Sequence, residues 1–140
     1  MGGLDLLVVD YLQLISAEER HGRSRAQQVG TIAWELKLLS MDLGCPVLLL
    51  SQLNREGAKE AKPPSILDLK ESGDIENHSS VVWLLYRPPN SEAAEVWLRQ
   101  AKNRDGVVTR WKGLSALRLA WDAETATFTD DYYEGARPNG

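Results

Sequence analysis

The chain has 140 residues, of which 43% are hydrophobic and 26% are charged, a balance that is ordinary for one globular domain. Its net charge of -4 argues against broad, charge-driven binding to nucleic acid but leaves room for binding through local basic loops. No apolar run approaches the roughly 20 residues that span a bilayer, and the N-terminus lacks the pattern of a signal peptide, so we expect a cytoplasmic protein without membrane contacts. The single cysteine, Cys45, excludes an intramolecular disulfide.

The first half of the chain has the pattern of a strand, a helix and a second strand. Residues 4–14 contain the continuous apolar run of a parallel strand that is covered on both faces. Ser24 followed by Gln27 is the pattern of a capping box, so a helix should begin there and end at Gly44. Residues 47–50 form a second short apolar strand. This order predicts a right-handed parallel crossover.

The next segment predicts a short helix and a third strand. Ser65 and Asp68 are candidate caps for a helix that runs through Leu69 and that Gly73 would end. Residues 81–86 form a third apolar strand, again of the parallel type.

The remaining segments predict antiparallel structure. An Asp-Gly turn at residues 103–106 would join residues 95–101 to residues 107–111 in a hairpin. Residues 117–121 alternate between apolar and other side chains, and residues 125–129 are candidates to pair with them. We therefore predict an α/β fold in which parallel strands with a crossover helix precede an antiparallel hairpin region. Three parallel strands make a thin sheet, so the chain has the character of part of a larger fold.

Polar residues follow two of the predicted parallel strands. Asp10 ends the first strand, at the sheet edge where open α/β sheets bind ligands, and an aspartate there can hold magnesium. The alternative is an aspartate that only caps the next loop. Ser51, Gln52 and Asn54 follow the second strand at the same edge, where an amide could contact a terminal phosphate. From the pattern alone, the start of a polar loop is the better explanation of these residues.

Three groups of cations are candidates for phosphate contacts. Lys102 and Arg104 lie at the tip of the predicted hairpin, where cations could reach a site on a neighbouring molecule, although a solvated turn is the simpler explanation. Lys70 precedes Gly73 in a short loop that could grip nucleic-acid phosphates. A basic cluster before the first helix consists of Arg20, His21, Arg23 and Arg25.

Five segments, in order, resemble motifs of the DnaB-type replicative DNA helicases. They are VVDYLQL at residues 8–14, SQLNR at 51–55, DLKESG followed by Ile75 and Glu76 at 68–76, LYR at 85–87, and AKNR at 101–104. The resemblance covers about residues 4–112. It implies that residues 1–131 are the C-terminal half of a RecA-like P-loop NTPase motor domain. Residues 132–140, at the end of the chain, are expected to be a flexible tail.

The resemblance also implies a role for each matching residue. Asp10 would hold the magnesium ion of bound ATP, and Gln52 would sense the γ-phosphate. Lys102 and Arg104 would reach into the adjacent subunit's site in a homohexameric ring. Single-stranded DNA would be contacted by Lys70, Glu71 and Gly73, together with Arg23 and Arg25. Further partners of such a helicase would be primase or a helicase loader.

The sequence also departs from the family pattern. It contains no G-x-x-x-x-G-K-[ST] phosphate loop, so we expect the chain alone to bind ATP and Mg²⁺ weakly and to be inactive. Lys70 stands where the family usually has arginine, and Asp105 to Val108 replace the usual NGPxG turn. Two alternatives remain open: a non-catalytic RecA-like accessory module that binds DNA or a helicase ring, and another RecA-family ATPase.

Overall fold

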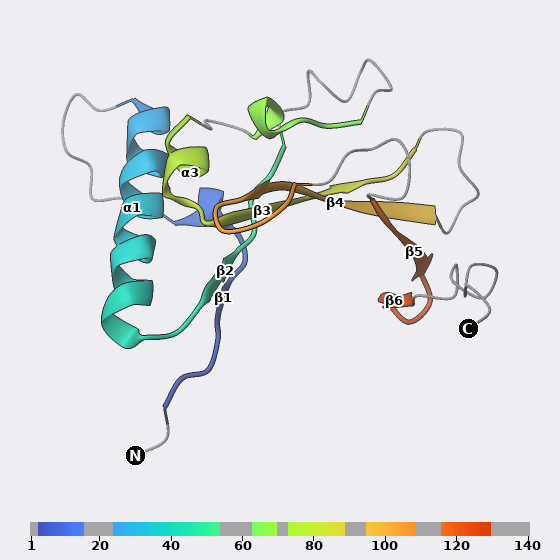
Figure 1. Cartoon of the computed structure of the whole chain (residues 1–140), viewed down its shortest axis with the longest axis horizontal. Coiled ribbons are helices and arrows are strands. Elements are labelled where there is room, and N and C mark those ends of the chain that lie inside the picture. The colour runs from blue at the N-terminus through green and yellow to red at the C-terminus, as the bar shows by residue number, and fades with distance from the viewer. Residues whose placement is uncertain are drawn as a thin grey trace. The chain divides into compact units, whose positions relative to one another are not determined.

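The computed structural model describes residues 3–15, 24–53, 63–69, 73–88, 95–108 and 116–129, and Figure 1 shows their helices and strands. The chain divides into two compact units. The first unit contains residues 1–55 and 66–79, and the second contains residues 56–65 and 80–140. The predicted tail at 132–140 lies outside the described residues.

The first unit contains a parallel pair of strands, β1 (Leu7–Val9) and β2 (Val47–Leu49). Alternate side chains differ in exposure: Val8 and Leu48 are register partners and are both exposed. The predicted strand at residues 4–14 is too long, because the chain turns into a 3-10 helix, η1 (Leu12–Leu14), soon after β1. Leu12 is fully buried there, so its apolar character reflects burial in a turn rather than a strand position.

A long helix, α1 (Arg25–Leu43), connects the two parallel strands. Its predicted capping box is confirmed, since the Gln27 backbone N–H donates to Ser24 Oγ at 3.3 Å and the Ser24 backbone N–H donates to Gln27 Oε1 at 2.9 Å. Gly44 ends the helix with φ of 62°, a left-handed conformation that costs glycine little. The buried face of α1 includes Val29 and Ile32.

A short helix, α3 (Gly73–His78), packs against α1. Gly30 on α1 lies against Asp74, and one turn further along both helices the Trp34 and His78 rings lie with centroids 5.1 Å apart. The prediction that Gly73 ends a helix is wrong, because the residue begins one. The predicted helix before it is only a 3-10 turn, η2 (Ile66–Asp68), which precedes an isolated bridge between Leu53 and Leu69.

The second unit is a four-stranded antiparallel sheet with the order β3-β4-β5-β6. Its strands are β3 (Val81–Tyr86), β4 (Glu95–Asn103), β5 (Leu117–Asp122) and β6 (Thr127–Thr129). The prediction that residues 81–86 join the parallel sheet is wrong, since β3 pairs antiparallel with β4. The predicted pairing of the last two strands is confirmed by the β5–β6 register.

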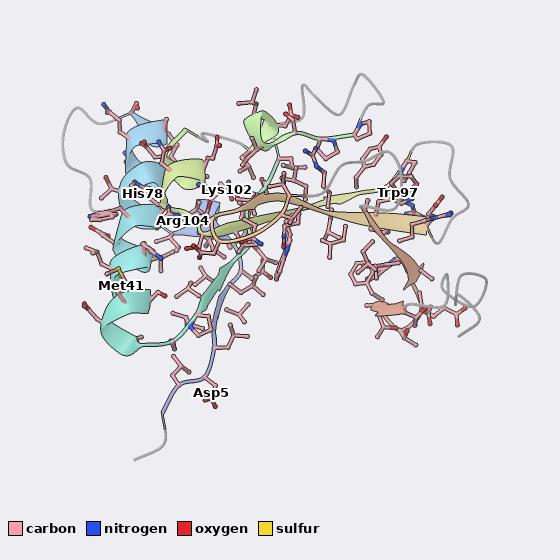
Figure 2. The ribbon with its side chains drawn as sticks, viewed as in Figure 1. Asp5, Met41, His78, Trp97, Lys102 and Arg104 are labelled. Atoms are coloured by element: carbon pink, nitrogen blue, oxygen red, sulfur yellow. The ribbon has the colours of Figure 1, made fainter. Side chains whose placement is uncertain are left out.

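The predicted hairpin arm after the Asp-Gly turn is not a strand where the structure describes it. Val107 and Val108 lie outside any strand, and residues 109–111 lie outside the described residues. The partners of β4 are instead β3 and β5. Across β4 and β5, Arg118 lies 5.7 Å from the centre of the Trp97 ring, which Figure 2 labels, and donates to Glu95.

Candidate functional site

Asp10 and Gln52 lie at one edge of the parallel pair, as predicted from the sequence. Asp10 directly follows β1, and Gln52 lies three residues beyond the end of β2. The two strands remain joined here, because the Leu50 N–H donates to the Val9 carbonyl at 3.0 Å and the Leu12 N–H donates to the Leu50 carbonyl at 2.9 Å. The Asp10 and Gln52 residues are both exposed, and the Asp10–Tyr11 peptide bond is cis.

This edge offers oxygen ligands of the kind that magnesium prefers. Among the described residues, no three acidic, histidine or cysteine side chains are arranged to hold a metal ion. Asp10 could therefore contribute a single carboxylate, with phosphate oxygens and water as the other ligands, which is the usual arrangement for Mg²⁺ with a nucleotide. The residues present fit such an ion. Asn54 lies outside the described residues.

Gln13 joins the two strand ends, a role that was not predicted from the sequence. Its Nε2 donates to Ser51 Oγ at 3.0 Å, and its Oε1 accepts from the Gln52 backbone N–H at 3.3 Å. Its own carbonyl accepts from Arg25 Nη2 at 2.8 Å. The available signal was a polar residue between Leu12 and Leu14 in a segment that otherwise has the pattern of a buried strand.

Of the two cations near the end of β4, Lys102 lies within the strand and Arg104 lies on the turn that follows it. Lys102 is half-buried opposite Val82, whereas Arg104 is exposed and donates its backbone N–H to the Ser80 carbonyl at 2.9 Å. The Asn103 side chain accepts from the Asp105 backbone N–H at 3.3 Å. Figure 2 shows Lys102 and Arg104 near each other at this end of the strand. The departure from the family's usual turn therefore still leaves an ordered backbone.

The Gln100 side chain forms further hydrogen bonds that hold the chain after this turn. Gln100 Nε2 on β4 donates to the Val107 carbonyl at 2.7 Å, while its Oε1 accepts from Trp83 Nε1 on β3 at 3.1 Å. The turn that carries Arg104 is thus bound back to the sheet on both sides.

The structure describes two of the five predicted DNA-contacting residues. Gly73 is exposed as the first residue of α3, and Arg25 is half-buried as the first residue of α1. The Arg25 guanidinium contacts the Gln13 carbonyl and, at 3.4 Å, Gln28 Oε1, so part of its hydrogen-bonding capacity is used within the unit. The other three, Arg23, Lys70 and Glu71, lie outside the described residues.

Comparisons with known proteins agree on one family. The model for the DnaB-like helicase C-terminal domain matches residues 1–130. The replicative DNA helicase DnaB of Leifsonia xyli subsp. xyli is 44% identical over 110 residues, covering 74% of this chain and 24% of that protein. The DnaB of Pasteurella multocida is 37% identical over 135 residues, covering 91% of this chain and 27% of its own length. The chain thus spans about a quarter of these relatives.

Solved structures show the same likeness. A DnaB-like replicative helicase, studied together with its interactions with primase, superposes with a TM-score of 0.76 at 30% identity, over 88% of this chain and 30% of the other. A second solved structure, that of an ATPase domain, gives a TM-score of 0.76 at 32% identity, over 88% of this chain and 43% of that one.

Within the described residues, no helix is both long and apolar enough to cross a membrane.

Proposed function

Because the chain belongs to the family of DnaB-like helicase C-terminal domains, we propose that it is the second half of a RecA-like motor domain in a hexameric replicative DNA helicase. In the complete protein, ATP hydrolysis would drive translocation along single-stranded DNA and duplex unwinding in the cytoplasm. The main support is the shared edge of β1 and β2, where Asp10 and Gln52 are both exposed beyond adjacent strand ends.

Asp10 is proposed to hold the magnesium ion of bound ATP, and Gln52 to contact the γ-phosphate. The ion, when bound, neutralises charge on the β- and γ-phosphate oxygens. The Asp10 carboxylate would fix the ion at the strand end, and the neutral Gln52 amide can hydrogen-bond a phosphate oxygen without repelling it. The backbone around the phosphates must come from a phosphate loop, and these 140 residues contain no such motif.

The turn after β4 is proposed to act on a neighbouring subunit. Arg104 is exposed on an ordered turn, which suits a guanidinium that must reach another molecule's γ-phosphate, and Lys102 lies two residues before it. Single-stranded DNA would be held by the segment before α3, with Lys70, Glu71 and Gly73, and by Arg23 and Arg25 before and at the start of α1. Primase is a candidate partner, as for the solved relative, and a helicase loader is another.

The purified chain and the complete helicase that carries it provide the test. We expect the chain alone to show no ATPase activity with or without single-stranded DNA, and the complete protein to show DNA-stimulated hydrolysis and unwinding. DNA-stimulated hydrolysis by the chain alone would contradict the proposal. The complete reading frame should also encode an upstream phosphate loop. A frame without one would favour the accessory module that binds DNA or a helicase ring.

A further inference from the structure

We propose that Gln13 is a positioning residue that holds the backbone of Gln52 in place beside Asp10. The inference rests on the proposed function, because it concerns the residue proposed to contact the γ-phosphate. Gln13 lies three residues after Asp10 on the segment that follows β1, whereas Gln52 follows β2. A single side chain therefore links the two loops that carry the proposed nucleotide contacts.

The orientation of the Gln13 amide follows from its partners. A backbone N–H can only donate, so the Gln52 N–H must face the Gln13 Oε1, at 3.3 Å. The amide nitrogen then faces Ser51 Oγ, at 3.0 Å, and donates to it. Because the two hydrogen bonds reach consecutive residues, the amide holds both the position and the direction of the chain as it leaves β2.

The backbone of Gln13 is itself fixed by several contacts within the first unit. The turn in which it lies is closed by hydrogen bonds from Leu14 to Tyr11 at 3.0 Å and from Ile15 to Leu12 at 3.1 Å. The Leu12 side chain is fully buried. The Gln13 carbonyl also accepts from Arg25 Nη2 at 2.8 Å. If Gln52 moved, Gln13 would therefore stay in place and the hydrogen bond between the Gln52 N–H and the Gln13 Oε1 would break.

Loss of this support should affect turnover more than nucleotide affinity. A misplacement of about 1 Å can cost on the order of 100-fold in rate when a group must meet a reacting phosphate. Nucleotide affinity should depend mainly on the phosphate loop and the magnesium ion, whereas the Gln13 amide bonds Ser51 and Gln52. We therefore expect kcat to fall by roughly 10- to 100-fold, with the KM for ATP changed by less than about threefold.

Three variants separate positioning from a general loss of structure. Gln13→Met keeps the length of the side chain and removes both hydrogen bonds. Gln13→Glu keeps an acceptor for the Gln52 N–H, and the Ser51 hydroxyl can turn to donate to the second carboxylate oxygen. Gln28→Met is the matched control, because Gln28 contacts the same arginine, Arg25, without reaching Gln52.

The first measurement is amide hydrogen exchange at Gln52, by NMR in the 140-residue chain or by deuterium uptake of the peptide over residues 50–53 in the complete helicase. Gln13→Met should speed exchange at Gln52, whereas Gln13→Glu and Gln28→Met should leave it close to the unchanged protein. The second measurement is steady-state ATPase activity of the complete helicase. Gln13→Met should lower kcat as above. Gln13→Glu is compared in the exchange measurement alone, because its carboxylate would add negative charge beside the proposed phosphate contact.

The outcomes distinguish the two proposals. Unchanged Gln52 exchange in Gln13→Met would overturn the positioning role, whatever the ATPase activity. Faster Gln52 exchange with unchanged kcat would show that Gln13 positions Gln52 but that Gln52 does not act on the γ-phosphate, which overturns the proposed role of Gln52. Gln52 exchange that is equally fast in the Met and Glu variants would also count against positioning through the acceptor.

Discussion

Replacing Gly30 with alanine should force α1 and α3 apart. A Cβ at Gly30 would lie 2.7 Å from Asp74 Cβ and 2.9 Å from its Cγ, whereas carbon atoms in contact need about 3.5–4.0 Å. Asp74 Cβ is fixed to the backbone of α3, so rotation of the side chain cannot relieve the contact. The short helix must therefore shift by on the order of 1 Å, which would disturb the Trp34–His78 ring contact one turn away.

The expected cost follows from two opposing terms. Overpacking typically costs about 1–3 kcal/mol, and alanine in place of glycine within a helix recovers about 1 kcal/mol. We expect Gly30→Ala to lower the free energy of unfolding by roughly 1 kcal/mol, measured by urea denaturation followed by circular dichroism. Gly73→Ala is the control, because nothing lies within 4 Å of a Cβ at that position. As a residue of α3 without a clash, it should raise the free energy of unfolding, by at most about 1 kcal/mol, rather than lower it.

A compensating change tests whether the contact itself is responsible. Asp74→Gly removes the Cβ that a side chain at Gly30 would meet, so it should cost less in the Gly30→Ala background than alone. Because the chain has five tryptophans, a change in fluorescence that disappears in a Trp34→Phe background would report a change in the contact between Trp34 and His78. A Gly30→Ala protein that is at least as stable as the unchanged chain, with unchanged fluorescence, would refute the reasoning.

Three further predictions concern the proposed site and the β5–β6 turn. In the complete helicase, Asp10→Asn should abolish ATP hydrolysis while the circular dichroism spectrum is retained; turnover within about tenfold, or ~1.4 kcal/mol of barrier, would contradict the magnesium role. Arg104→Ala should also stop turnover but leave nucleotide binding intact. Mixing Arg104→Ala subunits with Asp10→Asn subunits should restore part of the activity, because some interfaces then pair an intact Arg104 with an intact Asp10. Mixed rings that stay inactive would argue against action between subunits. The Thr125 hydroxyl and then the Glu124 backbone N–H donate to the Asp122 carboxylate and hold its pKa below the ordinary value of a carboxyl. When folding lowers the pKa of a carboxyl, the group stabilises the folded protein at pH values above its unfolded pKa, about 3.9, and this stabilisation is lost as the pH falls through the folded pKa. An NMR titration should therefore place the Asp122 midpoint below about 3.9, and Thr125→Val should raise that midpoint.

Features that depend on neighbouring residues could be predicted from the sequence. Both ends of α1 could be predicted, because a capping box needs only Ser24 and Gln27 and a left-handed helix end needs only Gly44. The common edge of Asp10 and Gln52 could also be predicted, since a parallel crossover places both strand ends on one side. Their chemical roles stay predictions that rest on the family resemblance.

Features that depend on distant partners could not be predicted in the same way. The apolar run of β3 is compatible with a parallel or an antiparallel strand, and only its pairing with β4 decides between them. The end of β1 was missed because apolar residues continue through the buried Leu12. Gln13 was missed because its partners, Ser51 and Gln52, lie 38 and 39 residues away in the sequence.

The outward side of β1 and β2 has a consequence for how the purified chain behaves in solution. Val8 and Leu48 expose 53% and 39% of their surfaces, and Leu6 and Leu50 beside them expose 48% and 40%. Contiguous apolar surface of this kind promotes self-association, and the net charge of -4 supplies only modest repulsion against it. Solubility should therefore fall as added salt screens that repulsion or as acid neutralises the carboxylates. Val8→Lys should raise solubility by interrupting the apolar surface, although it lowers the net negative charge by one.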